Sequence, residues 1–571
     1  MHENVGHARL GMLSWFKNYQ RASLAGDVSA GLIVTLLLIP QGIAYAILAG
    51  LPPVTGLYAS ILPPIAYALF GSSMVQSVGA QAITSLMIGS TLAALAPAGS
   101  GLSLVLAAQM ALIAGATLLL FGVLRLGFLA SFLSRPVMSG FTTGSALVIA
   151  GEQITPLLGG SLSKLHLAGM TIGLASLLAL WLAKHHLATL LIRIGVSKNQ
   201  ADMLSKLAPV AIVAAATITV AALGLNRLGV AVVGVIPSGL PVIAFSVSAE
   251  HWRPLLRPSL LLAFVIFLFS QSAAQSLAQK RGERIYANHE LLGLGAANLA
   301  SALSGSFPVT GSISRSAVNY TAGANTPLAS IISALFLGLI LVAPTGWLSL
   351  LPVPVLSATI IIAVLSMVDL AALKESWRYD RSDAAAMLAA IGGVLVLGVE
   401  EGVILGVVLS LATIIWRSSR PHMAILGRIP GSEHFRNVDR YSAETLPDVV
   451  LLRIDADLFF GNADVVVEHL ETLLQQREQM RAPVRHVVLV MSAVNVIDTT
   501  ALHALVELNR NLQKRAITLH FAEIKGPVMD RLKRSNFIAG LTENQLFLST
   551  AQAYDYLIDY SSKSRPAFKA L

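Results

Sequence analysis

The sequence contains no cysteine, which excludes disulfide bonds and thiol-ligated metals or clusters. Charged residues are also scarce: they make up 12% of the 571 residues, whereas a soluble domain averages about 25%. Hydrophobic residues account for 55%, and the mean hydropathy is +0.71. In a soluble protein the net charge of +9 would indicate nucleic-acid binding. This composition indicates an integral membrane protein instead, so the expected surroundings are a lipid bilayer and no nucleic acid is expected.

Sequence motifs of enzymes are missing as well. No phosphate-binding loop of the Walker type is found, so ATP-driven transport is not expected. The thirteen histidines show no metal-ligand spacing. The sequence therefore predicts neither an enzyme nor a cofactor.

Apolar segments, most of about 15–22 residues, recur between residues 24 and 418, and most are long enough to cross a bilayer. We count fourteen, of which the third and tenth are short or broken: 24–46, 54–70, 80–95, 102–122, 136–152, 168–186, 208–225, 258–278, 288–304, 312–322, 328–345, 354–368, 383–398 and 402–418. With residues 1–23 inside, twelve Lys and Arg fall in inner loops and four in outer loops. This asymmetry places both termini in the cytoplasm.

The two halves of this apolar region resemble each other. Gln41 lies in LLLIPQGIAYA and Gln271 lies in IFLFSQSAAQS, and a glycine-broken stretch follows each at a similar distance. The stretches are SVGAQAITSLM (Ser77–Met87) and PVTGSISRSAVN (Pro308–Asn319). Seven spans per half is odd, so the repeats are inverted in the membrane, as in known transporters. The alternative is that two apolar helices each contain a glutamine by chance.

Each broken stretch predicts a helix that starts inside the membrane. Gly79 permits the first break, Pro308 and Gly311 permit the second, and Ser312 or Ser314 can cap the second helix. A helix start exposes unpaired N–H groups with a partial positive charge. In inverted repeats two such starts point at one another, and together they form a pocket for an anion.

Arg315 is the charged residue of this predicted pocket. A charge at mid-membrane costs about 2.5–3.5 kcal/mol, so an arginine there indicates a nearby anion. Neutral hydrogen bonds would come from Thr310, Ser314 and Gln81. Gln41 and Tyr45, one helical turn apart, would form one wall of the pocket. Three structural alternatives stay open: Arg315 pairs with Glu152 or Glu290, the glycine-rich stretches are close helix contacts, and the glutamines join helices.

Beyond residue 418 the composition changes. Residues 419–445 are polar, contain Pro and Gly, and predict a linker. Residues 446–560 alternate strand-like runs with helical patterns, which indicates a small α/β domain. Residues 561–571 remain as a tail.

Several motifs resemble the SulP family of anion transporters, which includes relatives of pendrin and prestin. The segment IPQGIAYAILAGLPPVTGLYASILPPIAYALFGSS (Ile39 to Ser73) resembles the family signature, and MSAVNVIDTTALHALVEL resembles the core of its STAS domain. The resemblance covers roughly residues 20–560. It implies fourteen segments in two inverted repeats of seven, divided into a core and a gate domain, with an elevator-like motion and usually a homodimer. It also implies an anion site between segments 3 and 10, which brings Ala80 and Gln271 into the set of candidate residues.

The sequence departs from the family pattern at three places. Gln271 stands where many relatives carry a glutamate that is linked to proton or sodium coupling. We expect Gln271 to form a neutral, hydrogen-bonding wall of the anion pocket, as Gln41 does. Ala80 and Gln81 replace proline and an apolar residue. The STAS motif ends in Ala501 instead of glycine. Thr500 matches a phosphorylated position of soluble regulators, but a structural role, with Asp498 as the cap of a helix over 499–515, is the preferred interpretation.

These observations predict a secondary transporter or exchanger of small inorganic anions in a bacterial-type inner membrane. Sulfate is the first candidate, and bicarbonate, chloride and dicarboxylates remain open. One alternative is a nucleobase permease of the same fold, which would place carboxylates at the site and lack a STAS domain. The other is a membrane signalling module without transport, whose STAS domain binds a cytoplasmic protein.

Overall fold

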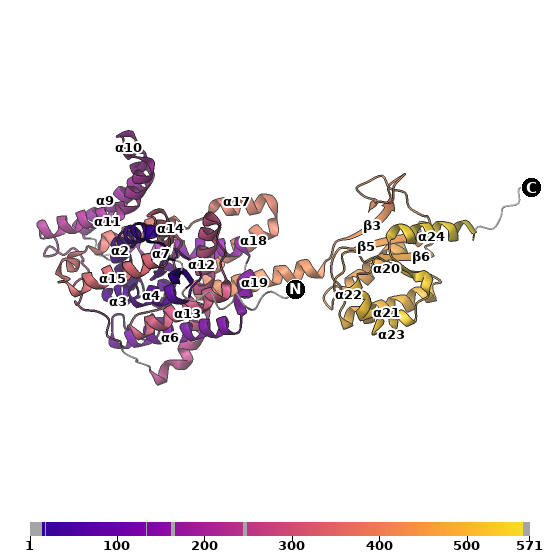
Figure 1. Ribbon diagram of the computed structural model, residues 1–571, viewed down its shortest axis with the longest axis horizontal. Helices are drawn as coiled ribbons and strands as arrows, with labels where there is room; N and C mark the ends of the chain where they lie inside the picture. The colour runs from indigo at the N-terminus through magenta and orange to yellow at the C-terminus, as the bar shows by residue number, and fades with distance from the viewer. Residues whose placement is uncertain (1–13, 18, 133, 161–165, 244–247, 564–571) are drawn as a thin grey trace, which may run out of the picture. The chain divides into compact units, whose positions relative to one another are not determined.

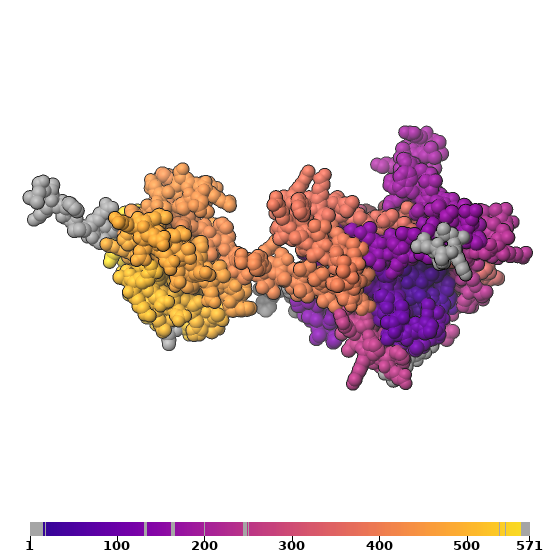
Figure 2. Space-filling view, turned by 180° about the vertical axis from the view of Figure 1, so that it is seen from behind, coloured from indigo at the N-terminus to yellow at the C-terminus, as the bar shows by residue number. Residues whose placement is uncertain are grey.

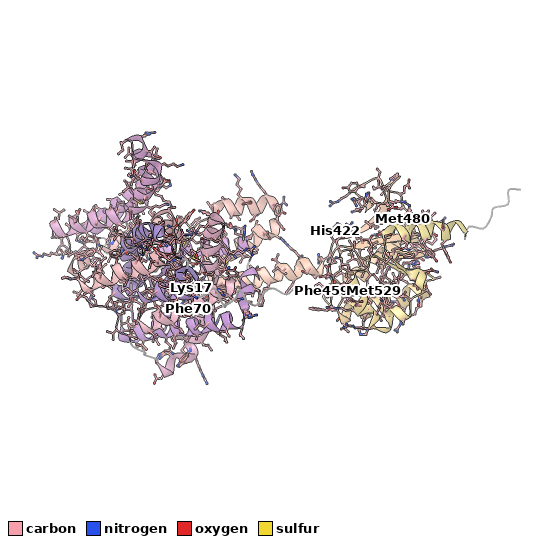
Figure 3. All side chains as sticks on the ribbon, viewed as in Figure 1. Lys17, Phe70, His422, Phe459, Met480 and Met529 are labelled. Atoms are coloured by element: carbon pink, nitrogen blue, oxygen red, sulfur yellow. The ribbon has the colours of Figure 1, made fainter. Side chains whose placement is uncertain are left out.

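The computed structural model describes residues 14–17, 19–132, 134–160, 166–243 and 248–563. The chain divides into two compact units, Met1–Ser410 and Leu411–Leu571. Of the predicted terminal segments, residues 1–13 and 564–571 lie outside the described part. Side chains fill the interior of each unit (Figure 3), and each unit has its own apolar core.

The first unit is helical (Figure 1). The helices of its first half are α1 (Ser14–Lys17), α2 (Leu24–Leu48), α3 (Pro53–Tyr58), α4 (Leu62–Phe70), α5 (Ala82–Ala93), α6 (Gly101–Val123), α7 (Arg135–Glu152), α8 (Ile154–Leu157), α9 (Leu167–Leu182), α10 (Ala188–Arg193) and α11 (Lys198–Ala222). Those of its second half are α12 (Trp252–Arg281), α13 (Ala287–Leu303), α14 (Ile313–Thr321), α15 (Leu328–Val342), α16 (Val353–Leu365), α17 (Leu370–Tyr379) and α18 (Arg381–Leu397). Helix α19 (Val399–Ser419) begins in this unit, and its residues from Leu411 on belong to the second.

Within the described ranges, eight helical stretches are long and apolar enough to cross a membrane, and α5 and α15 are shorter apolar helices. A π-helical turn, η4 (Ala183–Leu187), joins α9 to α10, and the end of this long helix projects from the unit (Figures 1 and 2). The predicted short segments are observed as short helices: α5 has 12 residues and α14 has 9.

The two halves of the helical unit interlock. Helix α13 of the second half packs against α4 and α6 of the first, α15 packs against α2, and α18 packs against α7. Helices that are distant in sequence are therefore neighbours, and a site can be assembled from both halves of the chain.

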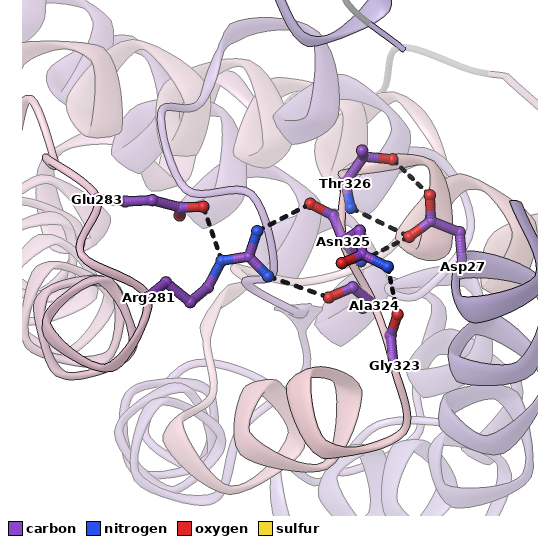
Figure 4. Close-up of polar contacts among 7 residues, drawn as sticks. All are labelled: Asp27, Arg281, Glu283, Gly323, Ala324, Asn325 and Thr326. Atoms are coloured by element: carbon purple, nitrogen blue, oxygen red, sulfur yellow. Dashed lines mark hydrogen bonds and ion pairs between the residues drawn. The ribbon is translucent and has the colours of Figure 1, made fainter. Parts of the chain in front are cut away.

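The loop after α14 is held between helices α2 and α12 (Figure 4). Asp27, in the first turn of α2, is fully buried and accepts hydrogen bonds from the backbone N–H groups of Asn325 (2.7 Å) and Thr326 (3.0 Å). Arg281, the last residue of α12, donates to the carbonyl oxygens of Ala324 (3.2 Å) and Asn325 (3.1 Å). These contacts tie α2, α12 and α14 together.

The second unit contains a six-stranded sheet of order β4-β3-β5-β6-β7-β8. Its strands are β3 (Met423–Arg428), β4 (Phe435–Asn437), β5 (Val449–Ile454), β6 (His486–Val490), β7 (Thr518–Ala522) and β8 (Leu546–Phe547). Strands β5 to β8 are parallel, and β3 pairs antiparallel with β4 and β5. The helices are α20 (Ala463–Gln479), α21 (Thr499–Lys514), α22 (Gly526–Lys533), α23 (Asn536–Ala539) and α24 (Thr550–Lys563).

The segment that the sequence predicts as a linker, 419–445, carries strands β3 and β4. Leu426 pairs with Asn437 across a turn that contains Pro430 and Gly431. Proline and glycine therefore mark a turn between two strands here. Strands β3 and β4 lie at one end of the sheet, and each contains residues that are not buried, which fits their polar composition.

Candidate functional site

The two broken stretches meet inside the helical unit. Strand β1 (Val78–Gly79) pairs antiparallel with β2 (Thr310–Gly311), so that Val78 lies opposite Gly311 and Gly79 opposite Thr310. The Ser312 N–H extends the pairing by donating to the carbonyl oxygen of Ser77 at 3.1 Å. All of these residues are buried. The expectation that the two stretches lie together is confirmed.

Helix α5 starts from this crossing at Ala82. Its N-cap is Gln81, whose side-chain oxygen accepts a hydrogen bond from the Thr84 N–H at 3.4 Å. The N–H groups of Ala82 and Ile83 have no acceptor among the described residues. This helix start thus offers backbone donors and no formal charge.

Helix α14 starts on the other side of the crossing at Ile313. Ser312 is its N-cap and accepts from the Arg315 N–H at 3.4 Å, so of the two predicted caps the structure uses Ser312. Ser314 is exposed, and its N–H and that of Ile313 have no acceptor among the described residues. Two sets of free backbone donors therefore flank one pair of short strands.

The Arg315 side chain joins the two helix starts. Its Nη1 donates to the carbonyl oxygen of Ala80 at 2.7 Å, and only 1% of the residue is exposed. Its Nε and Nη2 have no hydrogen-bond partner among the described residues. A Cβ added to Gly79 would lie 3.3 Å from Nη2, so the guanidinium group lies against the backbone of the first broken stretch. A buried cation with free donors is costly unless an anion completes it.

The alternative that Arg315 forms an ion pair is wrong. Glu290 is buried and hydrogen-bonded to Tyr67, Ser72 and Ser73. Glu152 is exposed at the end of α7, and none of the ion pairs between described residues contains it or Arg315. The guanidinium charge is therefore not neutralised by a neighbouring carboxylate.

Helices α2 and α12 pack around the crossing. Tyr45 on α2 is 8% exposed, and Gln41, one turn earlier and next to Pro40, is half-buried. Gln271 on α12 is buried, and its Oε1 has no partner in the described part of the chain. The structure thus brings all the predicted segments to one place, and the roles of these side chains in binding stay predictions.

Thr310 differs from the expectation. Its hydroxyl donates to the carbonyl oxygen of Ile266 on α12 at 3.0 Å, and the residue is fully buried. It therefore fixes β2 to α12 and is not available to a ligand. Sequence reasoning also missed Gln76, which contacts Ser270 on α12; no local pattern marks this residue, because its partner lies 194 residues away.

In the second unit, Asp498 caps α21 as expected, accepting from the Ala501 N–H at 2.8 Å. Thr500 follows in the exposed first turn of this helix. A hydroxyl in that position is accessible, and its modification stays a prediction.

Two histidines lie on neighbouring strands of the same sheet. His486 on β6 and His520 on β7 are joined by their ring nitrogens at 3.1 Å. Burial, and then the nearby His486, lower the pKa of His520 to about 4, so this ring is neutral at physiological pH. Burial also lowers the pKa of His486. Because both pKa values are lowered by burial, protonation at acidic pH favours the unfolded chain over the folded one.

Comparison with known proteins assigns both units. Residues 24–390 match the model of the sulfate permease family, and residues 440–553 match the STAS domain. A "Probable sulfate transporter" of Mycobacterium tuberculosis is 36% identical over 551 residues, which cover 94% of this chain and 96% of that protein. "Sulfate transporter 4.1, chloroplastic" of Arabidopsis thaliana is 33% identical over 575 residues, which cover 96% and 82%.

Solved structures show the same fold at low sequence identity. The murine anion transporter Slc26a9, in an inward-facing state, has a TM-score of 0.87 at 20% identity and covers 98% of this chain and 96% of its own. The transmembrane domain of the cyanobacterial bicarbonate transporter BicA has a TM-score of 0.58 at 21% identity, covering 68% and 98%. The chain therefore belongs to the sulfate permease (SulP) family: it is a multi-pass membrane transporter of anions with a C-terminal STAS domain, and not an enzyme.

Proposed function

We propose that the protein carries sulfate or a similar small inorganic anion across the membrane by secondary transport or exchange. The anion is held between the first turns of α5 and α14, by backbone N–H groups from both helices and by the charge of Arg315. Gln41, Tyr45, Ala80, Gln81, Gln271 and Ser314 complete its surroundings. Names of relatives at 36% and 33% identity favour sulfate over bicarbonate, chloride or a dicarboxylate.

One observation carries this proposal. Arg315 is a buried cation whose Nε and Nη2 have no partner among the described residues, and it lies between two helix starts with free N–H groups. Charge-assisted hydrogen bonds to an anion would satisfy these donors, and the two helix dipoles would add to the attraction. A divalent oxyanion such as sulfate offers four oxygens to several donors at once.

The surrounding architecture that we propose has fourteen membrane segments as two inverted repeats of seven. The pairs α2 with α12, and β1–α5 with β2–α14, are the corresponding elements of the two halves. A core that contains these four elements would move against the remaining helices in an elevator-like cycle. We further propose a homodimer in the inner (plasma) membrane with both termini in the cytoplasm, as the positive charges of the loops favour.

Two other functions are less well supported. A nucleobase permease would need carboxylates at the site; Glu290, the buried acid described above, is bonded to Tyr67 and two serines instead. A signalling module without transport would not need free donors on a buried arginine. The STAS domain can still bind a cytoplasmic protein, with Thr500 as a regulatory position.

Uptake of radiolabelled sulfate and bicarbonate into proteoliposomes tests the proposal. We expect sulfate uptake by the unmodified protein and its loss in Arg315→Ala, with correct assembly verified by size-exclusion chromatography. Arg227→Ala is the matched control, because Arg227 lies in the turn after α11 and outside the elements of the site. Unchanged sulfate uptake in Arg315→Ala would contradict the proposed site, and uptake of bicarbonate alone would contradict the substrate.

A further inference from the structure

A buried carboxyl group lies behind the crossing of the two short strands. Glu290, in the first turn of α13, is 0% exposed. Its Oε1 accepts hydrogen bonds from the Ser72 N–H (2.9 Å), the Ser72 hydroxyl (2.7 Å) and the Ser73 N–H (3.2 Å). Its Oε2 lies 2.7 Å from the Tyr67 hydroxyl.

A chain of side chains connects this carboxyl group to the candidate anion site. Tyr67 Oη also lies 3.0 Å from Gln76 Oε1. The other end of the Gln76 amide, Nε2, lies 3.3 Å from the carbonyl oxygen of Ser270 and close to its Oγ. Ser270 precedes Gln271 on α12. A Cβ on Gly311 would lie 1.7 Å from Gln76 Nε2, so the amide also presses against strand β2.

The hydrogen atoms of this chain can be counted. Tyr67 has one hydroxyl proton, but its oxygen lies within bonding distance of two acceptors, Glu290 Oε2 and Gln76 Oε1. One of the two groups must therefore supply a proton of its own. In the structure the Gln76 amide directs Nε2 toward α12, where it donates to the carbonyl oxygen of Ser270, and directs Oε1 toward Tyr67. With the amide in this orientation, the second proton is supplied by Glu290 Oε2.

Among the described residues, the elements packed against α13 place no charged side chain beside Glu290. The packed elements are α4, α6, α12 and η3 (Leu126–Phe132), of which α4 contributes only Tyr67 and neither α6 nor η3 has a titratable residue. The titratable residues of α12 lie in its outer turns: Arg253, Arg257, Lys280 and Arg281. Arg281 is bonded to Glu283, and His289 of α13 itself contacts the ring of Tyr286.

We propose that Glu290 is a proton-binding site whose protonation state is coupled to the anion site through Tyr67 and Gln76. In the arrangement described, Oε2–H donates to Tyr67, Tyr67 donates to Gln76, and Gln76 donates to Ser270. When Glu290 releases its proton, the Tyr67 hydroxyl turns to the carboxylate and leaves Gln76 Oε1 without a donor. The amide then moves, and with it the contacts to β2 and to Ser270.

A short path for this proton leads to solvent. Ser72 is half-buried, contacts Glu290 Oε1 and accepts from the backbone N–H of the exposed Tyr286 at 3.2 Å. Water at Ser72 can give the proton to the carboxyl group and take it back, and no other bond is made or broken. The site would supply the proton coupling that Gln271 cannot, and this inference depends on the proposed anion transport.

Glu290→Gln is the decisive variant, because its amide can accept from Ser72 and Ser73 and donate to Tyr67, as the protonated acid does. We expect an inward proton gradient to stimulate sulfate uptake by the unmodified protein. In E290Q the uptake driven by sulfate alone should persist, and the stimulation should be lost. Arg227→Ala, which lies outside the elements of both sites, is the control and should keep the uptake and its stimulation by the gradient.

Infrared difference spectroscopy tests the proton without transport. The spectrum of the unmodified protein minus that of E290Q should contain the carbonyl band of a protonated carboxylic acid. Tyr67→Phe should keep this band but lose the stimulation of uptake by the proton gradient. If E290Q does not assemble, the gradient response is tested with Tyr67→Phe instead. The absence of the band, a full gradient response in E290Q, or no response in the unmodified protein would overturn the proposal.

Equilibrium binding of sulfate separates this inference from the proposed function. If the unmodified protein and E290Q bind sulfate equally and both respond to the gradient, the proton site is wrong and the anion site stands. If neither binds sulfate, the proposed function itself is wrong.

Discussion

The two broken stretches have the same backbone plan and different chemistry. Each consists of a two-residue strand, a capped helix start and a short helix. The first carries no charge, and its cap is Gln81; the second is capped by Ser312 and carries Arg315. The guanidinium group reaches back to the carbonyl oxygen of Ala80, so one charged residue of the second stretch is bonded to the first.

This difference suggests that the backbone and the arginine have separate roles in the site. The paired backbones create a place with N–H donors from both sides, which any small anion can use. The single arginine adds the net charge and fixes its position. A change that disrupts the packing of the strands, as at Gly311, should therefore affect folding, whereas a change to Arg315 or to a position in contact with its guanidinium group should affect binding.

The largest effect is expected from removing the charge. Arg315→Ala should weaken sulfate binding by about 10- to 100-fold, because a hydrogen bond to a charged group contributes about 1.5–3 kcal/mol. Binding of radiolabelled sulfate to purified protein measures this change. Arg315→Lys should recover part of the affinity, since the charge is kept and the planar fork is lost. Equal affinity in all three proteins would mean that the helix starts bind the anion alone.

The two glycines of the strands should differ in their tolerance of a side chain. A Cβ on Gly311 would lie 1.7 Å from Gln76 Nε2, so Gly311→Ala should destabilise the protein by about 1–3 kcal/mol through overpacking. In Gly79→Ala the nearest atoms are Ser60 Oγ at 3.2 Å and Arg315 Nη2 at 3.3 Å, so we expect weaker sulfate binding with little loss of stability.

Thermal unfolding in detergent measures the stability of both glycine variants. Gly151→Ala is their control, because a Cβ at Gly151 meets nothing within 4 Å. A Gly311→Ala protein as stable as this control would contradict the tight packing of Gln76 against β2.

A carboxylate introduced at residue 271 on α12 tests whether this position faces the anion. Gln271→Glu should lower the apparent sulfate affinity about tenfold at pH 7, or about 1.4 kcal/mol, through repulsion between the carboxylate and the anion. Acidification should restore the affinity, because protonation removes the added charge. Binding measured between pH 5 and 8 checks this, with Gln271→Asn as the neutral control. An affinity of Gln271→Glu that does not change with pH would indicate that residue 271 does not face the anion.

The smallest effects are expected at the caps. Ser312→Ala and Gln81→Ala should each cost about 0.5 kcal/mol of stability, at the low end for caps, since both hydrogen bonds measure 3.4 Å. Ser100→Ala removes the cap of α6, which is a stronger bond at 3.1 Å, and should reduce stability without affecting sulfate binding. A large stability loss in one of the first two variants alone would contradict the equivalence of the two helix starts.

The sequence predicts the local features of the site well. Gly79 and Gly311 mark the breaks, and Ser312 and Asp498 cap the helices as expected, because caps and turns depend on residues within about four positions. Alternation of strands and helices in the second unit follows from hydrophobic runs and was predictable for β5, β6 and β7.

Contacts between distant residues could not be predicted in the same way. The bond from Arg315 to Ala80 spans 235 residues, and the bond from Gln76 to Ser270 spans 194. The sequence predicts Thr310 as a ligand because it does not reveal which acceptor the hydroxyl bonds. In the fold this hydroxyl donates to the carbonyl oxygen of Ile266. Strands β3 and β4 were missed because they are short, polar and flanked by proline and glycine.

The position of a bound anion tests the central claim most directly. Selenate is a heavier analogue of sulfate, and its anomalous signal in a crystal of the complex locates it independently of the protein. The account predicts one selenate between the first turns of α5 and α14, within hydrogen-bonding distance of Ser314 and of backbone N–H groups from both helices. Selenate bound elsewhere, with none between these two helix starts, would contradict it.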